Sequence, residues 1–401
     1  MLLPLYEEKL EPQDRSLCHE LTLGVLRRRI YLDRLIEKLT NKRKIDAEVR
    51  IILRMGIYQL RFLERIPAHA ALNDAVNLTQ RAKKTSAKGF VNAVLRRLTR
   101  EDVEVDAPDE IEKLSIETSH PRWLLEKWID QFGLEETAGL ARENNQTPGS
   151  SFRWTAKTTD AVKQSLSREN IENEKNFLRE LAAAGKIYFQ ERGSQLIAET
   201  VQLKENDKFL DLCAAPGSKT TFVANRKMAV DHQNFIVAGD FSWNRVAVLR
   251  DNCRRQGVGF VSILQYDAEK TLPFAEQSFD VVLVDAPCSG TGTIRHNPEI
   301  RYFLAEKDFA GLSGKQLGIL ENASKLIKPG GKLIYSTCSL EKEENETVCE
   351  RFLAKTPGFE KVKPETPDQF LTGDGYARTF PQTDKMDGFF IAVFEKNRVF
   401  G

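Results

Sequence analysis

The chain has 401 residues, 41% of them hydrophobic and 29% charged, which predicts a multidomain globular protein with substantial cores. We find no apolar stretch long enough to cross a bilayer and no secretory signal, so we expect a cytoplasmic protein without a membrane partner. Six cysteines without a C-x-x-C pair argue against a zinc ribbon or a disulfide scaffold, and we expect no metal site.

The net charge of +1 hides an asymmetry along the chain. Residues 1–100 contain 21 lysines and arginines against 11 acidic residues, a balance of +10. Of the whole-chain totals of 59 and 58, this leaves 38 basic and 47 acidic residues, or −9, for residues 101–401. A basic module joined to an acidic one indicates a nucleic-acid-binding appendage on an enzyme. A basic but merely solvated helical surface is the alternative.

The first part of the chain carries the apolar spacing of amphipathic helices, which predicts an all-α domain over residues 1–105. Pro67 and the stretch Lys83–Ser86 interrupt the pattern. Four apolar faces are expected, at Leu17, Leu21, Gly24 and Val25; at Leu32, Leu35, Ile36 and Leu39; at Val49, Ile52, Leu53, Gly56, Ile57 and Leu60; and at Val91, Val94, Leu95 and Leu98. Basic residues cluster around the breaks, at Arg27, Arg28, Arg29, Lys83, Lys84, Lys88, Arg96 and Arg97.

Residues 106–200 are expected to form linker helices and a small α+β subdomain. The stretch 101–118 is acidic and contains a proline, as is typical of a linker, and His120–Trp123 then opens a helix. Further along, the pattern predicts a strand at Phe152–Trp154, a helix near Thr158–Leu166 and a strand at Ile187–Phe189.

Residues 201–401 alternate short apolar runs with amphipathic helices, which predicts a Rossmann-like α/β domain. Runs of this kind form a mostly parallel sheet covered on both faces. The expected strands lie at 209–212, 236–238, 261–264, 281–284 and 333–335.

Four of these strands carry a carboxylate at or just past their ends, namely Asp211, Asp240, Asp267 and Asp285. In an open α/β sheet, ligands bind outside the carboxyl ends of the strands. The turn Cys213–Lys219 after the first strand is neither G-x-G-x-x-G nor a phosphate-cradling loop. A ligand with ribose and adenine but without phosphates fits best, and S-adenosylmethionine is the obvious one.

Each candidate cofactor contact has a chemical reason. Asp240 would accept two hydrogen bonds from the ribose hydroxyls, and Asp267 one from the adenine amino group. Gly217 allows close backbone approach, and Lys219 would bind loop carbonyls or the cofactor carboxylate. The expected cofactor-binding residues are Cys213, Ala214, Ala215, Pro216, Gly217, Ser218, Lys219, Asp240, Asp267 and Asp285.

Two cysteines lie at the ends of later strands, Cys288 in Asp285–Gly290 and Cys338 in Tyr335–Ser339. Thiols beside a cofactor site offer covalent chemistry. The stretch His296–Arg301, just past the Cys288 loop, either lines a substrate pocket or forms a plain loop-to-helix connection.

Three motifs, Asp211–Thr220, Asp285–Gly292 and Thr337–Ser339, resemble those of the Sun/Fmu superfamily of RNA cytosine-5 methyltransferases. The tail Asp387–Ala392 is similar to the closing strand of that family. Residues 66–76 and 89–97 resemble a NusB-like RNA-binding domain. These motifs, the NusB-like part and residues 119–123 occur together in the RsmB (Sun/Fmu) family of bacterial 16S rRNA (cytosine-5)-methyltransferases. The chain resembles that family over nearly its whole length.

The resemblance implies methyl transfer from S-adenosylmethionine to C5 of a specific cytosine in 16S rRNA. It assigns the nucleophile that adds to C6 to Cys338, and assistance in proton removal and product release to Cys288. Asp285 would hydrogen-bond N3 and the exocyclic amine of the base. The implied partner is RNA and not DNA, and we expect a monomer. The same chemistry on tRNA and a non-catalytic RNA-binding assembly factor are the alternatives.

Three features depart from the family pattern. Ser218 stands where the family usually has a second glycine, and Arg153-Trp154-Thr155 replaces the usual R-x-N. We also expect the helical domain to lack the leading helix of a NusB-like domain.

Overall fold

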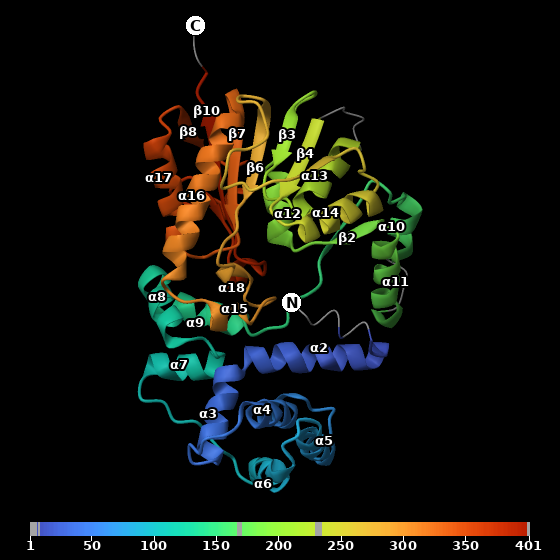
Figure 1. Ribbon diagram of the computed structural model, residues 1–401, viewed down its shortest axis with the longest axis vertical. Coiled ribbons are helices and arrows are strands. Elements are labelled where there is room, and N and C mark those ends of the chain that lie inside the picture. The colour runs from blue at the N-terminus through green and yellow to red at the C-terminus, as the bar shows by residue number, and fades with distance from the viewer. Residues whose placement is uncertain (1–5, 7–8, 167–170, 229–234, 399–401) are drawn as a thin grey trace. The chain divides into compact units, whose positions relative to one another are not determined.

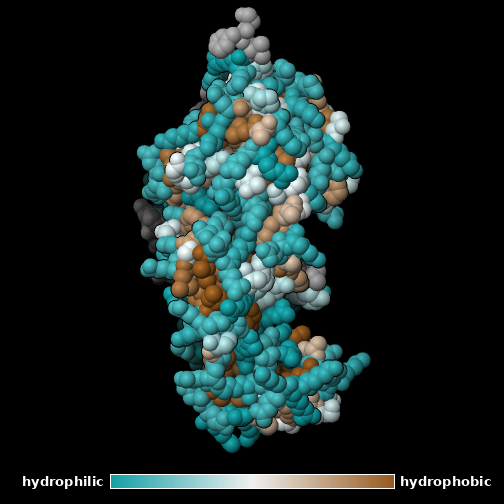
Figure 2. All heavy atoms as spheres, turned by 90° about the vertical axis from the view of Figure 1, so that its left-hand side faces the viewer, coloured by the Kyte–Doolittle hydropathy of each residue, from teal (hydrophilic) through white to brown (hydrophobic). Residues whose placement is uncertain are grey.

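The computed structural model describes residues 6, 9–166, 171–228 and 235–398. The chain divides into two compact units, one of residues 1–147 and 294–303 and the other of residues 148–293 and 304–401 (Figure 1). We call them the helical unit and the sheet unit. Among the described residues, no helix is long and apolar enough to span a membrane, and hydrophilic side chains cover most of the face in Figure 2.

The helical unit is built from amphipathic helices that bury three of the four apolar faces expected from the sequence. In the first expected face the prediction is wrong for Leu17, which is exposed, and Leu23 is buried instead. Helix α3 buries Leu32, Leu35, Ile36 and Leu39, and these pack with residues of α4 and α6 in one core. The helices are α2 (Pro12–Arg27), α3 (Arg29–Leu39), α4 (Ala47–Phe62), α5 (Ala68–Arg81), the 3-10 turn η1 (Thr85–Ala87), α6 (Lys88–Leu98), α7 (Glu110–Thr118), α8 (Arg122–Phe132) and α9 (Leu134–Glu143). The expected absence of a leading helix concerns residues that lie outside the described ones.

The stretch 101–118 is not a linker throughout, because α7 occupies its second half. The Asp109 carboxylate caps this helix by accepting a hydrogen bond from the backbone N–H of Glu112 at 2.8 Å. Leu114 and Ile116 are buried on its inner face. The acidic composition that suggested a linker therefore belongs to a capped helix with charged residues in its first turn.

The segment 294–303 packs within the helical unit, where it ends in the short helix α15 (Ile300–Phe303). The Arg301 side chain is fully buried and donates hydrogen bonds to the backbone oxygens of Thr118 (3.0 Å) and Ser119 (3.2 Å). Burial lowers the pKa of Arg301 to about 10. Arg301 is thus an interior structural residue, and the pocket-lining interpretation fails for this side chain.

The sheet unit contains an eight-stranded sheet with the strand order β5-β4-β3-β6-β7-β10-β8, and β9 pairs with β10. The five strands from β5 to β7 are parallel, and β10 is antiparallel to its neighbours. The strands are β3 (Lys208–Asp211), β4 (Phe235–Asp240), β5 (Ser262–Gln265), β6 (Phe279–Asp285), β7 (Ile327–Thr337), β8 (Phe359–Val362), β9 (Ala377–Arg378) and β10 (Phe390–Lys396). The mostly parallel Rossmann-like sheet is confirmed.

Two hydrophobic cores cover the two faces of this sheet, as expected of a parallel sheet. One core contains Leu320 of α16 (Asp308–Leu326) and Phe352 of α17 (Glu346–Lys355). The other contains residues of α12 (Arg192–Glu199), α13 (Ser218–Met228) and α14 (Trp243–Arg255). Figure 1 shows the two groups of helices on opposite sides of the strands.

The strands and the helix expected between residues 152 and 189 are present, and they belong to the sheet unit. Strands β1 (Phe152–Trp154) and β2 (Ile187–Phe189) form an antiparallel pair, and they enclose α10 (Asp160–Leu166) and α11 (Ile171–Ala183) in the chain. Strands β8 and β9 were missed because both are short, and Glu360 and Lys361 break the apolar run of β8.

Candidate active site

The four predicted carboxylates lie along one edge of the sheet. Asp240, Asp211 and Asp285 are the last residues of the neighbouring parallel strands β4, β3 and β6, and Asp267 lies two residues beyond β5. Because parallel strands end at the same edge, the order along that edge is Asp267, Asp240, Asp211, Asp285. The sequence prediction of a row of acids is therefore confirmed as a spatial arrangement.

The turn between β3 and α13 is fixed by side chains from several elements. Arg245 and Asn252 of α14 donate to the carbonyl oxygens of Ala215 (2.7 Å) and Pro216 (2.8 Å), respectively. Gly217 has φ +98°, and a Cβ atom there would lie 2.6 Å from Cδ1 of Leu249. The turn therefore requires glycine at this position, where the backbone packs closely against Leu249.

Arg153 also holds this turn, which sequence reasoning missed. Its Nη2 donates to the carbonyl oxygen of Ser218 at 3.2 Å and to Oγ1 of Thr221 at 2.7 Å, and its Nε donates to Oε1 of Gln190 at 2.7 Å. Burial lowers the pKa of Arg153 to about 10. Arg153 thus ties β1 to the start of α13. Its position in the sequence motif gave the signal, but its partners could not be inferred.

Asp240 and Asp267, on neighbouring strands at one end of the row, retain free hydrogen-bonding capacity. Asp240 is buried and accepts from the Ala215 N–H at 3.2 Å, with Arg245 Nη1 at 3.4 Å. Asp267 accepts from the Glu269 N–H at 3.0 Å and pairs with Lys270 at 3.4 Å. A carboxylate has about four acceptor positions, so both can accept further donors such as hydroxyl or amino groups.

Asp285, at the other end of the row, forms an ion pair with Lys219. The Lys219 Nζ lies 2.5 Å from Oδ2 of Asp285, and the Ser336 hydroxyl donates to Oδ1 of Asp285 at 2.9 Å. Burial lowers the pKa of Lys219, but the charge and hydrogen bond of Asp285 outweigh this effect and raise it overall. In the structure, Lys219 therefore binds Asp285.

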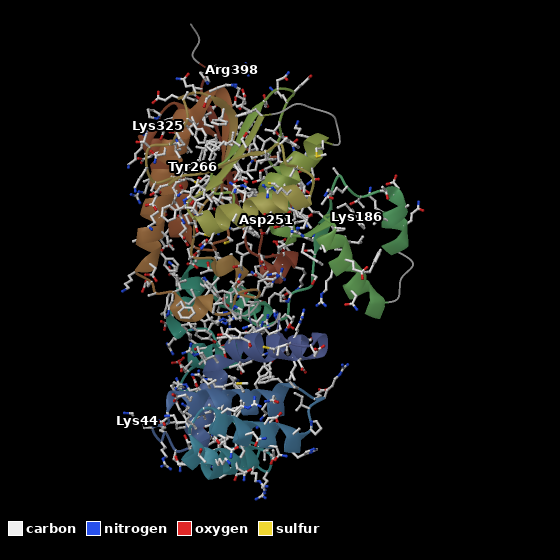
Figure 3. All side chains as sticks on the ribbon, turned by 45° about the vertical axis from the view of Figure 1, so that its right-hand side comes forward. Lys44, Lys186, Asp251, Tyr266, Lys325 and Arg398 are labelled. Atoms are coloured by element: carbon white, nitrogen blue, oxygen red, sulfur yellow. The ribbon has the colours of Figure 1, made fainter. Side chains whose placement is uncertain are left out.

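Asp211 is the most deeply buried acid of the row. The Thr220 hydroxyl donates to its Oδ2 at 2.6 Å, whereas its buried Oδ1 accepts no hydrogen bond from the described residues. Burial, partly opposed by the Thr220 hydrogen bond, raises the pKa of Asp211 to about 7. Next to it, the Tyr266 ring lies over Gly239 and its hydroxyl donates to the Leu212 carbonyl at 3.2 Å (Figure 3).

Cys288 and Cys338 come together at the same edge. Their Sγ atoms are 3.2 Å apart, and the backbone N–H of Cys338 donates to Sγ of Cys288 at 3.3 Å. Both are free, half-buried thiols. The hydrogen bond with Cys338, together with burial, raises the pKa of Cys288 well above its usual value. At neutral pH Cys288 is therefore a protonated thiol that lies against Cys338.

The residues at this edge fit S-adenosylmethionine. The row offers carboxylates, which suit a diol, an amino group and a positively charged sulfur, and the turn has no phosphate-binding lysine motif. Oδ1 of Asp211 adds a buried acceptor without a partner among the described residues. This fold and this set of residues define an S-adenosylmethionine-dependent methyltransferase.

Comparison with known proteins identifies the family. The model of the family described as 16S rRNA methyltransferase RsmB/F matches residues 198–395, and the NusB family model matches residues 2–100. The probable ribosomal RNA small subunit methyltransferase B of Bacillus subtilis is 33% identical over 97% of this chain and 92% of the relative. The corresponding protein of Klebsiella pneumoniae is 32% identical over 99% and 94%. The chain belongs to the RsmB/F family and is an S-adenosylmethionine-dependent RNA methyltransferase.

Solved structures agree with this fold. The protein titled PH0851 is 26% identical and superposes with a TM-score of 0.80 over 96% of this chain and 91% of that one. NSun6 from Pyrococcus horikoshii, solved with SFG, is 20% identical and superposes with a TM-score of 0.60. The superposed region covers 69% of this chain and 98% of the NSun6 chain. The second likeness concerns the fold alone.

Proposed function

We propose that the chain methylates C5 of a cytosine in 16S rRNA through a covalent bond between Cys338 and C6 of the base. The observation that carries this proposal is the pair of free thiols, with Sγ atoms 3.2 Å apart, at the ligand-binding edge of the sheet. A module that only bound RNA would have no use for two thiols in that position. Membership in the RsmB/F family supports rRNA as the substrate.

The thiols solve a chemical problem of the substrate. C5 of cytosine is a poor nucleophile. Addition of the Cys338 sulfur to C6 turns the ring into an enamine-like species whose C5 can attack a methyl group. S-adenosylmethionine supplies the electrophilic methyl group. A base must then accept the C5 proton, and the electrons of that C–H bond expel Cys338 from C6 as a thiolate. Cys288 lies next to Cys338 and assists this last step.

Asp285 stabilises the base while it is bound to Cys338. A hydrogen bond from the exocyclic amine to this carboxylate, and one from N3 once it is protonated in the adduct, would fix the base, and the neighbouring Lys219 keeps the carboxylate in place. We assign the ribose to Asp240, the adenine amino group to Asp267, and the remaining cofactor contacts to the turn Cys213–Lys219.

We further propose that residues 1–105 bind RNA, that residues 106–200 connect, and that residues 201–401 catalyse. Within the helical unit, five cations form what we call the loop cluster, namely Lys42, Arg43, Lys44, Lys83 and Lys88. The first three follow α3, Lys83 precedes η1, and Lys88 is the first residue of α6. Among the described residues none of the five forms an ion pair.

Three contacts bring these two loops together. Arg43 stacks over the Phe90 ring at 5.5 Å, Lys84 pairs with Asp46 at 2.8 Å, and Arg97 donates to the Leu39 carbonyl oxygen at 3.3 Å. Lys44 extends away from the ribbon (Figure 3). Unpaired exposed cations on one surface suit the phosphates of a nucleic acid. Since C5 and C6 must be reachable, the target base would be unstacked, in a loop or flipped out.

The decisive experiment is transfer of labelled methyl groups to unmodified 16S rRNA by wild type, Cys338→Ala and Cys288→Ala, followed by sequencing of the modified site. We expect no turnover in Cys338→Ala and a trapped covalent protein–RNA complex in Cys288→Ala. Normal turnover in Cys338→Ala would exclude it as the nucleophile. Transfer to tRNA but not to 16S rRNA would replace the proposed substrate.

A further inference from the structure

Glu344 is a buried carboxylate beside both cysteine loops. It ends the 3-10 turn η3 (Lys342–Glu344), which follows β7, and its side chain is fully buried. No cation among the described residues forms an ion pair with it. A carboxylate buried without a cation is costly unless hydrogen bonds compensate for the lost water.

Four hydrogen bonds provide that compensation, two to each carboxylate oxygen. Oε1 accepts from the backbone N–H of Ser289 at 2.9 Å and from Nε2 of Gln316 at 2.8 Å. Oε2 accepts from the hydroxyls of Ser289 at 2.5 Å and Ser339 at 2.6 Å. All four acceptor positions of the carboxylate are therefore occupied by protein donors.

These donors flank the two thiols. Ser289 follows Cys288, and Ser339 follows Cys338. Gln316 of α16 also donates to the Pro287 carbonyl oxygen at 3.0 Å, so the Cys288 loop is held on both sides of its sulfur. One carboxylate thus joins two loops that are separated by 50 residues in the chain.

We propose that Glu344 is a positioning residue that sets the spacing between Cys288 and Cys338. This inference rests on the proposed two-thiol function and adds a residue that touches neither substrate nor cofactor. Because a buried carboxylate without a cation stabilises a fold poorly, its contribution lies in the geometry that the four bonds fix. Loosening those bonds should separate the sulfurs and slow the step in which Cys288 acts on the base held by Cys338.

The substitution Glu344→Gln tests this idea with almost no change in size. The amide NH₂ group of the new side chain cannot accept hydrogen bonds from the donors that face it. Up to two of the four hydrogen bonds are therefore lost. We expect kcat to fall by about a hundredfold or less, with KM for RNA and for S-adenosylmethionine unchanged and with covalent protein–RNA complex accumulating. Lys342→Ala, an exposed residue of the same turn, is the matched control and should behave like wild type.

Ser289→Ala provides a milder variant should Glu344→Gln fold poorly. It removes the hydroxyl contacts of Ser289 with Glu344 and with Oγ of Ser339 (3.1 Å) but keeps the bond from the Ser289 backbone N–H, and we expect partial accumulation of the covalent complex. If both residues act through one bond, the two changes together should cost less than the sum of the single effects. Strict additivity, or wild-type kinetics in both single variants, would overturn the proposal.

A direct measure of the thiol spacing separates this proposal from the proposed function. Phenylarsine oxide condenses with two neighbouring thiols, forming two arsenic–sulfur bonds and releasing water. It should bind wild type tightly, Cys288→Ala weakly, and Glu344→Gln with at least tenfold lower affinity. Unchanged arsenical affinity in Glu344→Gln refutes the positioning role even if methylation is confirmed. A loss of affinity in that variant supports the role even if Cys288→Ala traps no RNA.

Discussion

The helical unit and the sheet unit use charge in opposite ways. Between Arg81 and Arg100 the chain has seven cations and no carboxylate, and four of them (Arg81, Lys83, Arg96 and Arg100) are exposed without an ion pair among the described residues. At the edge of the sheet, Lys219, Asp211 and Glu344 are buried, and hydrogen bonds or an ion pair hold each of them. Exposed charges attract over a distance that salt shortens, whereas buried groups act at contact and escape screening.

The difference predicts that RNA affinity and methyl-transfer chemistry are separable in this chain. Substitutions in the loop cluster should change how binding depends on salt and leave the chemical step intact. Substitutions at the sheet edge should do the reverse. Each prediction below tests one side of that division.

The largest expected effect is at Cys338. Cys338→Ser replaces the thiol by a much poorer nucleophile and should lower kcat by about a thousandfold or more, while RNA affinity stays unchanged at every salt concentration. Cys18→Ser, a half-buried thiol of the helical unit, is the matched control. Single-turnover methyl transfer and filter binding measure the two quantities. A parallel loss of RNA affinity would break the division between the units.

The loop cluster gives the next largest effect. Changing Lys42, Arg43 and Lys44 together to Gln should weaken RNA binding and reduce the slope of log affinity against log salt by about two to three. At saturating RNA, kcat should be unchanged.

The control for this triple variant has the same change in net charge in the sheet unit. It replaces Lys315, Lys325 and Lys355 with Gln, and Figure 3 shows Lys325 in that unit. An equal change of slope in both triple variants would mean that net charge alone, and not the loop cluster, attracts the RNA.

The sequence predicted the sheet edge well because its signals are local. The small-residue turn, the acid at the end of each strand and the two cysteine motifs all follow from short stretches of chain, and the parallel order of the strands brings them together. Long amphipathic helices were equally clear. Strand β8 and the helix α7 were missed because a short edge strand and a capped acidic helix both look like connections.

Long-range partners could not be predicted. Nothing in the sequence around Glu344 indicates that its carboxylate meets Ser289 and Gln316, 55 and 28 residues away. Arg153, Arg301 and Lys219 likewise find partners that only the packed chain defines. Residue type indicates that a buried charge needs a partner, but the three-dimensional fold selects which one.

Asp211 should give the sheet unit a stability that falls as pH rises. Its pKa is about 7 in the folded chain against an ordinary value of 3.8, so between about pH 4 and pH 7 the folded state holds a proton that the unfolded state has lost. Over that range the free energy of unfolding should fall by up to a few kcal/mol, and above pH 7 this contribution should stay constant.

Asp211→Asn should remove this pH dependence. The stability of the variant relative to wild type should therefore be greater at pH 8 than at pH 5. Urea unfolding of both proteins at the two pH values measures the difference. The control is Asp251→Asn, because Asp251 is an exposed carboxylate of α14 (Figure 3). Asp211 would not be the titrating group if Asp211→Asn kept the pH dependence of wild type.

The smallest expected effect is at Arg153, a buried cation that makes hydrogen bonds and lies over the rings of Tyr188 and Phe222. Arg153→Lys keeps the charge but loses the planar fork that reaches Gln190, Ser218 and Thr221 together. Since Ser218 belongs to the cofactor turn, we expect a rise of about threefold to tenfold in KM for S-adenosylmethionine, with kcat and the salt dependence of RNA binding unchanged. The control is Arg226→Lys, because Arg226 is an exposed arginine of α13, the helix that begins at Ser218. A change in kcat without a change in KM for S-adenosylmethionine would mean that Arg153 supports the thiols and not the cofactor turn. Arg153 would then belong to the residues of the sheet unit that serve the chemical step.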